Sequence, residues 1–200
     1  MRLKNLVPTV AKLHLLKAAI LPYLTYCHLT WHFCWASDKR KLECTQERGL
    51  HEFFRDGKST YEQLLKKANL KSLYERRLQD IACLMFKVRH NLCPPTVKNL
   101  FSLKSSTYNL RGADFHIPRF NTVTYGKHSL RYIGPLLWNR LSTNIKTSPS
   151  LQSFKKQICL TNLSSKLEYD CENCVLCSTW TIIWFRERSM CLFDLIMSIK

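Results

Sequence analysis

Residues 72–92, SLYERRLQDIACLMFKVRHNL, contain the clearest helical pattern in the chain. Ser72 and Glu75 have the spacing of an N-terminal capping box. Cys93-Pro94-Pro95 is expected to end the helix, because a residue before proline avoids the helical region. Apolar side chains that recur at steps of three and four share one helical face: Tyr74, Leu78, Ile81, Met85, Val88 and Leu92. Their burial, at about 1.5–3 kcal/mol each, predicts a core helix. Its outer face carries the basic residues Arg76, Arg77, Lys87 and Arg89.

Three further helices are predicted upstream of this segment. The first is expected to begin at Pro8 and to be broken or kinked at Pro22. Its inward face is predicted to hold Leu6, Val10, Leu13, Leu16 and Ile20. The second runs from Ser37 to about Phe54, with Leu42, Leu50 and Phe53 inward. The third is short and follows a capping-box pattern at Ser59 and Glu62.

Downstream, the pattern loosens before it becomes helical again. Phe115/Ile117 and Val123/Tyr125 alternate as short strands do, although Pro118 would restrict a strand to a sheet edge. Trp138 follows an expected break at Gly134-Pro135, and Ser148-Pro149 marks the start of a helix with Phe154 inward. We therefore predict a mainly α fold, an irregular helical bundle with a loop-rich or short-strand segment around residues 104–126 and a poorly ordered C-terminal tail.

The net charge of +17 is the most unusual property of the composition. A soluble domain needs a charge of magnitude only about 2–8, so the excess favours a polyanionic partner such as nucleic acid. Residues 96–160 contain ten basic residues and one acid, Asp114, which is a formal excess of nine. Aromatic residues interleave with these cations and can stack on unpaired bases. A basic surface without a dedicated partner, with the aromatics in the core, is the alternative, and we favour a core position for Trp138 and Phe154.

Candidate contacts with nucleic acid come from four places in the chain. Lys39, Arg40 and Lys41 lie in the first turn of a predicted helix, where they oppose the helix dipole unless an anion is near. A solvated charged face is the alternative there. The complete candidate set is Lys39, Arg40, Lys41, Arg76, Arg77, Lys127, Arg131, Arg140, Lys155 and Lys156.

The ten cysteines are scattered, apart from Cys171, Cys174 and Cys177. Lys12 and Lys17 interrupt the apolar run that a signal peptide requires, so we expect an intracellular protein with mostly reduced thiols. The close group can supply three thiolates to zinc, while a tetrahedral site needs a fourth ligand. Cys159, Cys191 or a distant histidine can serve. No apolar run reaches the roughly 20 residues that span a membrane, so we expect no membrane partner.

No catalytic residues emerge from the sequence. Two-metal phosphoryl transfer needs clustered carboxylates, but the aspartates are isolated in the chain, with no Asp-Asp or Asp-x-Asp. The five glycines form no phosphate-binding loop, and no G-x-S-x-G or HExxH motif is present. A nucleophilic Cys/His pair from distant positions stays open.

Several segments together resemble the C-terminal region of reverse transcriptases encoded by LINE-type non-LTR retrotransposons of the CR1/jockey kind. They cover about residues 2–160. The similar stretches are 12–31, with Leu21-Pro22-Tyr23-Leu24-Thr25-Tyr26; 39–48; Leu73-Tyr74 with Arg76-Arg77-Leu78; and 126–154, with Leu137-Trp138-Asn139-Arg140-Leu141. The order and spacing of these stretches carry the resemblance. The cysteines near 171–177 are also similar to tails of such elements.

The resemblance implies a thumb and post-thumb region that grips an RNA or DNA template–primer, with the palm and fingers of the parent polymerase as further partners. It implies thumb-like helices at 1–56, a basic helical region at 57–163 and a cysteine-containing tail at 164–200. The fingers, palm and paired aspartates of the family are not in this sequence, so we expect a non-catalytic fragment. The alternatives are a helical protein-interaction or scaffold module and a small zinc-binding protein.

Overall fold

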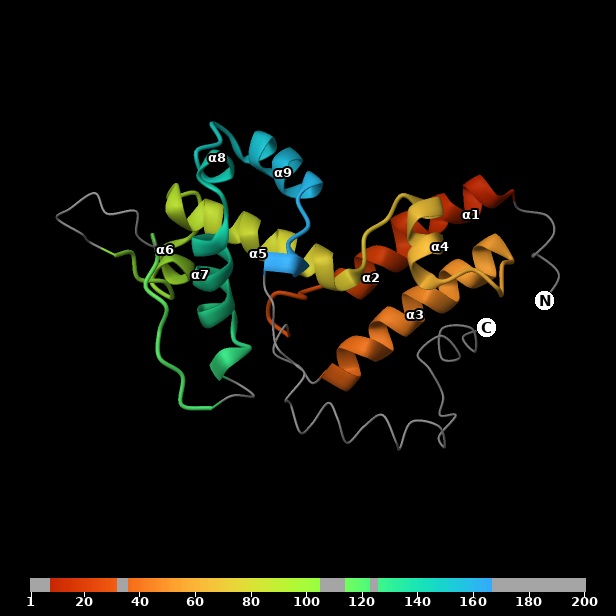
Figure 1. The fold of residues 1–200 in the computed structure, drawn as a ribbon, viewed down its shortest axis with the longest axis horizontal. Helices are drawn as coiled ribbons and strands as arrows, with labels where there is room; N and C mark the ends of the chain where they lie inside the picture. Colours follow the sequence, from red (N-terminus) through yellow and green to blue (C-terminus); the bar gives the residue numbers. More distant parts are fainter. Residues whose placement is uncertain (1–7, 32–35, 105–113, 123–125, 167–200) are drawn as a thin grey trace. The chain divides into compact units, whose positions relative to one another are not determined.

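The structure is a computed structural model that describes residues 8–31, 36–104, 114–122 and 126–166 (Figure 1). The described chain is mainly α-helical, which confirms the predicted fold class. Apart from Ser164–Lys166, the expected C-terminal tail lies outside the described residues. Contacts divide the chain into two compact units. The first contains the described parts of Met1–Tyr26 and Cys34–Leu73, and the second those of Cys27–Phe33 and Tyr74–Glu168. Residues 57–73, which follow the 56/57 boundary implied by the resemblance, lie in the first unit.

The first unit begins with one continuous run of helix. Helix α1 (Thr9–Leu15) passes through a π-helical turn, η2 (Leu16–Ile20), into α2 (Leu21–Thr25). Pro22 is the second residue of α2, directly after the π turn, and the helical run continues through it. Leu16 is buried as predicted, but Val10 is 67% exposed, so its predicted inward position is wrong.

Helices α3 (Ala36–Phe54) and α4 (Tyr61–Ala68) complete this unit. Leu50 is buried and Phe53 packs against the core, as predicted. The core joins all three helical segments through Leu16, Leu50, Leu64 and Ala68. A neighbouring cluster contains Leu21, Leu24 and Leu73.

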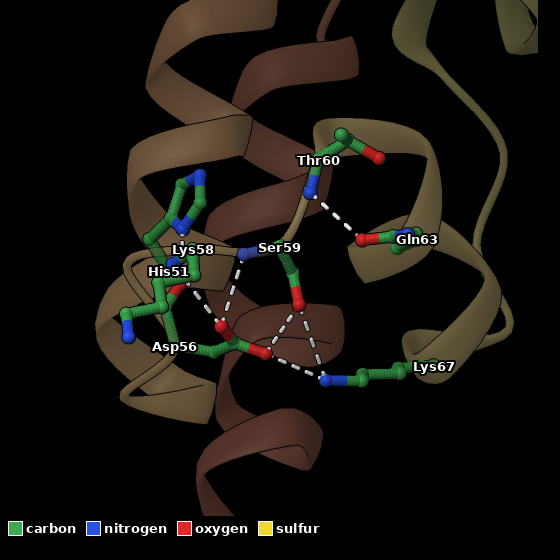
Figure 2. Close-up of polar contacts among 7 residues, drawn as sticks. All are labelled: His51, Asp56, Lys58, Ser59, Thr60, Gln63 and Lys67. Atoms are coloured by element: carbon green, nitrogen blue, oxygen red, sulfur yellow. Dashed lines mark hydrogen bonds and ion pairs between the residues drawn. The ribbon is translucent and has the colours of Figure 1, made fainter.

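The turn between α3 and α4 is closed by polar contacts around Asp56 (Figure 2). Its carboxylate accepts from the backbone N–H of Ser59 at 3.0 Å, from the Ser59 hydroxyl, and from Lys67 Nζ at 2.6 Å. Ser59 is therefore engaged with Asp56, and the capping residue is Thr60, whose N–H donates to Gln63 Oε1 at 3.0 Å. The cap predicted at Ser59 and Glu62 is one residue too early.

The second unit is organised around α5 (Leu73–Arg89). Leu78, Ile81, Met85 and Val88 are all buried, as predicted. Leu92 is 60% exposed, because the helix ends at Arg89 and Asn91 takes a left-handed conformation (φ 58°). The Leu92 N–H then donates to the carbonyl of Lys87 at 2.8 Å, which is a Schellman-type end. The prolines at 94 and 95 begin the next helix instead of ending this one.

Four short helical elements and η4 follow α5: α6 (Pro95–Lys98), α7 (Leu130–Arg140), α8 (Thr143–Lys146), α9 (Leu151–Leu160) and η4 (Ser164–Lys166). Helix α7 continues through Gly134-Pro135, so the predicted break is wrong. A Cβ on Gly134 would lie 2.7 Å from Met85 Sδ and 3.3 Å from the Phe101 ring. The glycine thus permits the close approach of α7 to α5 that Figure 1 shows.

The core of this unit is aromatic. The Phe86 and Phe154 rings are 4.6 Å apart, and Trp138 stacks on Phe154 at 5.9 Å. Phe115 meets the Trp138 ring edge-on at 6.0 Å. Both Trp138 and Phe154 are fully buried, which confirms their predicted core positions. Glu75 joins the end of the unit to α5, because its carboxylate accepts from the backbone N–H of Leu163 at 2.8 Å.

The segment predicted as loop-rich or short-strand contains one isolated antiparallel bridge in its described part, Leu103 with Phe115. The N–H of Lys104 donates to the Asp114 carbonyl at 3.0 Å, and that of His116 donates to the Ser102 carbonyl at 2.9 Å. Residues 105–113 and 123–125 lie outside the described chain. Among the described helices, none is long and apolar enough to cross a membrane.

Candidate nucleic-acid interface

Asp114 is the only acid between residues 96 and 160, and it is used inside the second unit. Its Oδ2 accepts the indole N–H of Trp138 at 2.8 Å and lies 3.6 Å from Lys146 Nζ. The adjacent Asn139 bonds to both backbone groups of Phe115, at 3.2 and 3.0 Å. Asp114 therefore balances the charge of Lys146, and its carboxylate is also occupied by the indole N–H of Trp138.

Most of these cations are exposed. Their side chains lie on α6, α7 and α9 and on the irregular segments beside the Leu103–Phe115 bridge. The exposed set is Lys98, Lys104, Arg119, Arg131, Arg140, Lys155 and Lys156. Four of them are candidates from the sequence, and a fifth candidate, Lys127, is half-buried. This is the charged surface that a phosphate backbone would meet.

Arg77 does not belong to that surface, so its predicted position on the outer face of α5 is wrong. Its side chain is 1% exposed. The guanidinium lies 5.4 Å from the centroid of the Trp31 ring and 5.8 Å from that of Tyr74, distances typical of cation–π contacts. The neighbouring Arg76 is half-buried.

The candidates on α3 belong to the first unit. Lys41 Nζ pairs with Asp38 Oδ1 at 3.1 Å. Arg40 is exposed and Lys39 is half-buried. Asp38 lies in the same first turn and balances part of the positive charge there. The helix therefore carries its own compensation for the charges that oppose its dipole.

One pocket of about 320 Å³ lies in the second unit. Its polar lining comes from Ser102, His116, Arg119 and Arg131. Its apolar lining comes from Leu100, Phe101, Pro118 and Pro135. None of these residues is acidic. Within the described part of the chain, neither arginine forms an ion pair with an acid.

Two contacts bring the polar lining together. The hydrogen bond from the His116 N–H to the Ser102 carbonyl joins two of the four residues across the short bridge. Phe120 meets Tyr132 edge-to-face, with ring centroids 5.1 Å apart, and each aromatic residue directly follows one of the two arginines. A Cβ on Gly126 would lie 2.7 Å from the Phe120 Cβ, so a glycine is needed beneath this contact.

Only Arg131 of this pocket was among the sequence candidates. Arg119 and His116 were not among them, because the two arginines are twelve positions apart and neither periodicity nor a motif relates them. One signal was available. The first turn of α7 contains Arg131 but no acid, an unfavourable arrangement for the helix dipole.

No metal site is present among the described residues, where no group of three or more histidine, cysteine or acidic side chains is placed to hold an ion. Cys171, Cys174 and Cys177 lie outside them. Of the described cysteines, Cys27 and Cys159 are exposed and Cys83 is buried. Burial raises the pKa of the Cys83 thiol to about 11, and the charge of Asp80 adds to the increase.

Comparisons with known proteins identify no relative of this chain, so function is argued from its fold and its pocket. No family model matches the chain, and neither a curated protein nor a solved structure matches it significantly.

Proposed function

We propose that the second unit binds the phosphate backbone of RNA or DNA without reading base sequence. The observation that carries the proposal is the placement of Asp114. The acid is held by Trp138 and Lys146, while Arg119, Arg131 and the lysines of α9 are exposed. Cations without compensating acids bind phosphates by releasing condensed counterions, which is independent of sequence.

The resemblance to the C-terminal region of LINE-type reverse transcriptases supports the same proposal and names the partner as a template–primer. In that reading the chain grips the duplex for the palm and fingers of a polymerase and does no synthesis itself, since this sequence has no paired aspartates. Primer extension by the purified chain with magnesium would contradict the non-catalytic part of the proposal.

Binding of a labelled duplex and an RNA–DNA hybrid, measured by fluorescence anisotropy over a series of salt concentrations, tests the function. We expect log K to fall linearly with log salt, by about 0.9 for each phosphate neutralised on a duplex. The double variant Lys155→Gln/Lys156→Gln should lower affinity equally for unrelated sequences and reduce the slope. The matched control is Lys58→Gln/Lys66→Gln, which removes two exposed charges from the first unit. Undetectable binding at low salt, or an equal loss in the control, would contradict the proposal.

A second candidate function is protein docking through the α1 surface. Val10 and Leu15 are 67% and 59% exposed there. They line a shallow, open depression of about 580 Å³ together with Pro8, Ala11, His14 and Ala18. The double variant Val10→Ser/Leu15→Ser separates the two functions. Reduced self-association in light scattering, with nucleic-acid affinity unchanged, would support docking.

We also propose zinc as a ligand of Cys171, Cys174 and Cys177, on the basis of their spacing alone. Metal analysis of protein purified without chelators tests this, and a zinc content near zero would remove the site.

A further inference from the structure

The lining of the Arg119–Arg131 pocket fits a terminal phosphate better than a phosphate inside a strand. We propose that this pocket binds a phosphate monoester, as found at the end of a nucleic-acid strand or on a free nucleotide. The inference deepens the proposed function and rests on it for the source of the phosphate. The pocket lies in the second unit, and the pattern of charges along the sequence does not identify it as a site.

The donors in the pocket exceed what a phosphate within a strand can accept. Each guanidinium offers up to five N–H donors in a planar fork, which suits two oxygens of one phosphate. Ser102 and His116 add a hydroxyl and an imidazole. An internal phosphodiester has two free oxygens and one charge, whereas a terminal monoester has three free oxygens and a charge of about −1.5 to −2. The donor set therefore matches the monoester.

The position of Arg131 adds a second, separate argument. It is the second residue of α7, which is eleven residues long. The hydroxyl of Ser129, the residue before the helix, donates to the Gly126 carbonyl at 2.7 Å and does not cap the first turn. Backbone N–H groups at the start of a helix favour an anion, so a phosphate beside Arg131 would offset the repulsion between this arginine and the dipole.

The size and the walls of the pocket limit the ligand. Its volume of about 320 Å³ is at the small end of the range for ligand sites, roughly 300–1,000 Å³. Such a space accommodates a phosphate and part of one nucleotide, and it excludes a duplex. Phe101 and Pro135 are buried and form part of its apolar wall. A sugar or base attached to the phosphate would lie against that wall.

The test compares two single-stranded oligonucleotides that differ only in a 5′-phosphate or a 5′-hydroxyl, labelled at the 3′ end and titrated at one low salt concentration. We expect the intact chain to bind the phosphorylated strand about tenfold more tightly, since the charge-assisted hydrogen bonds to the terminal phosphate are lost in the hydroxyl-ended strand. In Arg119→Gln/Arg131→Gln the ratio should fall to about one. The control Lys98→Gln/Lys156→Gln removes two exposed charges outside the pocket lining and should weaken both strands alike.

Competition with adenosine monophosphate, and with adenosine as its control, distinguishes the two sources. If adenosine monophosphate displaces the phosphorylated strand and adenosine does not, the pocket binds free nucleotides as well as strand ends. If the chain prefers the phosphorylated strand but the monophosphate does not displace it, the pocket binds strand ends.

Two results would overturn the inference. One is equal affinity of the intact chain for both strands with no effect of the monophosphate. The other is a preference for the phosphorylated strand that survives in Arg119→Gln/Arg131→Gln. Backbone binding without an end preference would leave the proposed function standing. If the chain binds adenosine monophosphate but not the hydroxyl-ended strand, the pocket inference stands and the proposed backbone binding is contradicted.

Discussion

The indole N–H of Trp138 donates to Asp114 Oδ2 at 2.8 Å, which ties helix α7 to the short bridge that precedes it. The same carboxylate lies 3.6 Å from Lys146 Nζ. One acid therefore holds the core tryptophan and balances one lysine, while Arg119, Arg131 and the lysines of α9 are exposed.

This relationship predicts different effects for two substitutions at Asp114. Asp114→Ala leaves the buried indole N–H without an acceptor, and we expect a loss of about 1–3 kcal/mol in the free energy of unfolding. Asp114→Asn keeps an acceptor oxygen and should cost less. Urea denaturation followed by tryptophan fluorescence measures both. Equal losses in the two variants would show that the hydrogen bond to Trp138 is not what stabilises this region.

Gly134 offers a test of how closely α7 packs on α5. A Cβ there would lie 2.7 Å from Met85 Sδ and 3.3 Å from the Phe101 ring, so Gly134→Ala overpacks the core. We expect a loss of about 1–3 kcal/mol in unfolding free energy. Gly57→Ala is the matched control, because no atom lies within 4 Å of its Cβ position. Thermal or urea unfolding compares them. Alanine is favoured over glycine in a helix by about 1 kcal/mol, so a Gly134→Ala chain more stable than the parent by that amount would refute the close approach.

The cysteines should differ in reactivity at neutral pH. Burial raises the pKa of the Cys83 thiol to about 11, so it stays protonated, and the thiolate is the reactive form. The exposed Cys159 should react with a thiol reagent much faster. Mass spectrometry of the labelled peptides after a short exposure tests this.

Unfolded Cys83 loses its proton near pH 9 and folded Cys83 near pH 11. Stability should therefore decrease between these values, and less so in Cys83→Ala.

Asp56 should contribute stability that disappears in acid. The Lys67 ammonium, and then the Ser59 hydroxyl and N–H, hold the pKa of this carboxyl well below its ordinary value of 3.8. A lowered folded-state pKa means that the stabilisation is present above pH 3.8 and is lost as the pH falls through the folded value. Asp56→Asn should therefore be less stable than the parent at pH 7, and the difference should narrow below about pH 4.

Urea denaturation at several pH values measures the Asp56 effect. The control is Glu62→Gln, which removes an exposed carboxylate nearby without touching the turn. A difference between Asp56→Asn and the parent that stays constant with pH would contradict a charge-dependent role.

The sequence alone determined the helices and several of their buried faces. Leu78, Ile81, Met85 and Val88 are buried because helical periodicity is a local property, readable from residues three and four apart. The core positions of Trp138 and Phe154 followed from the same reasoning. Local patterns failed near the start of α1, where Val10 is 67% exposed although it shares a helical stripe with the core residues Leu13 and Leu16.

Tertiary structure alone decided which charged residues meet. Helical periodicity predicts Arg77 on the outer face of its helix, but in the fold Trp31, which is distant in sequence, packs against it. Arg119 and Arg131 share a pocket because Phe120 packs on Tyr132 and because the His116 N–H bonds to Ser102. These contacts join segments that belong to no shared helix or strand, so no repeat in the sequence predicts them. Their geometry is set by the packing of the intervening chain. The sequence therefore supplied the charge of this protein, and the packing decided where that charge converges.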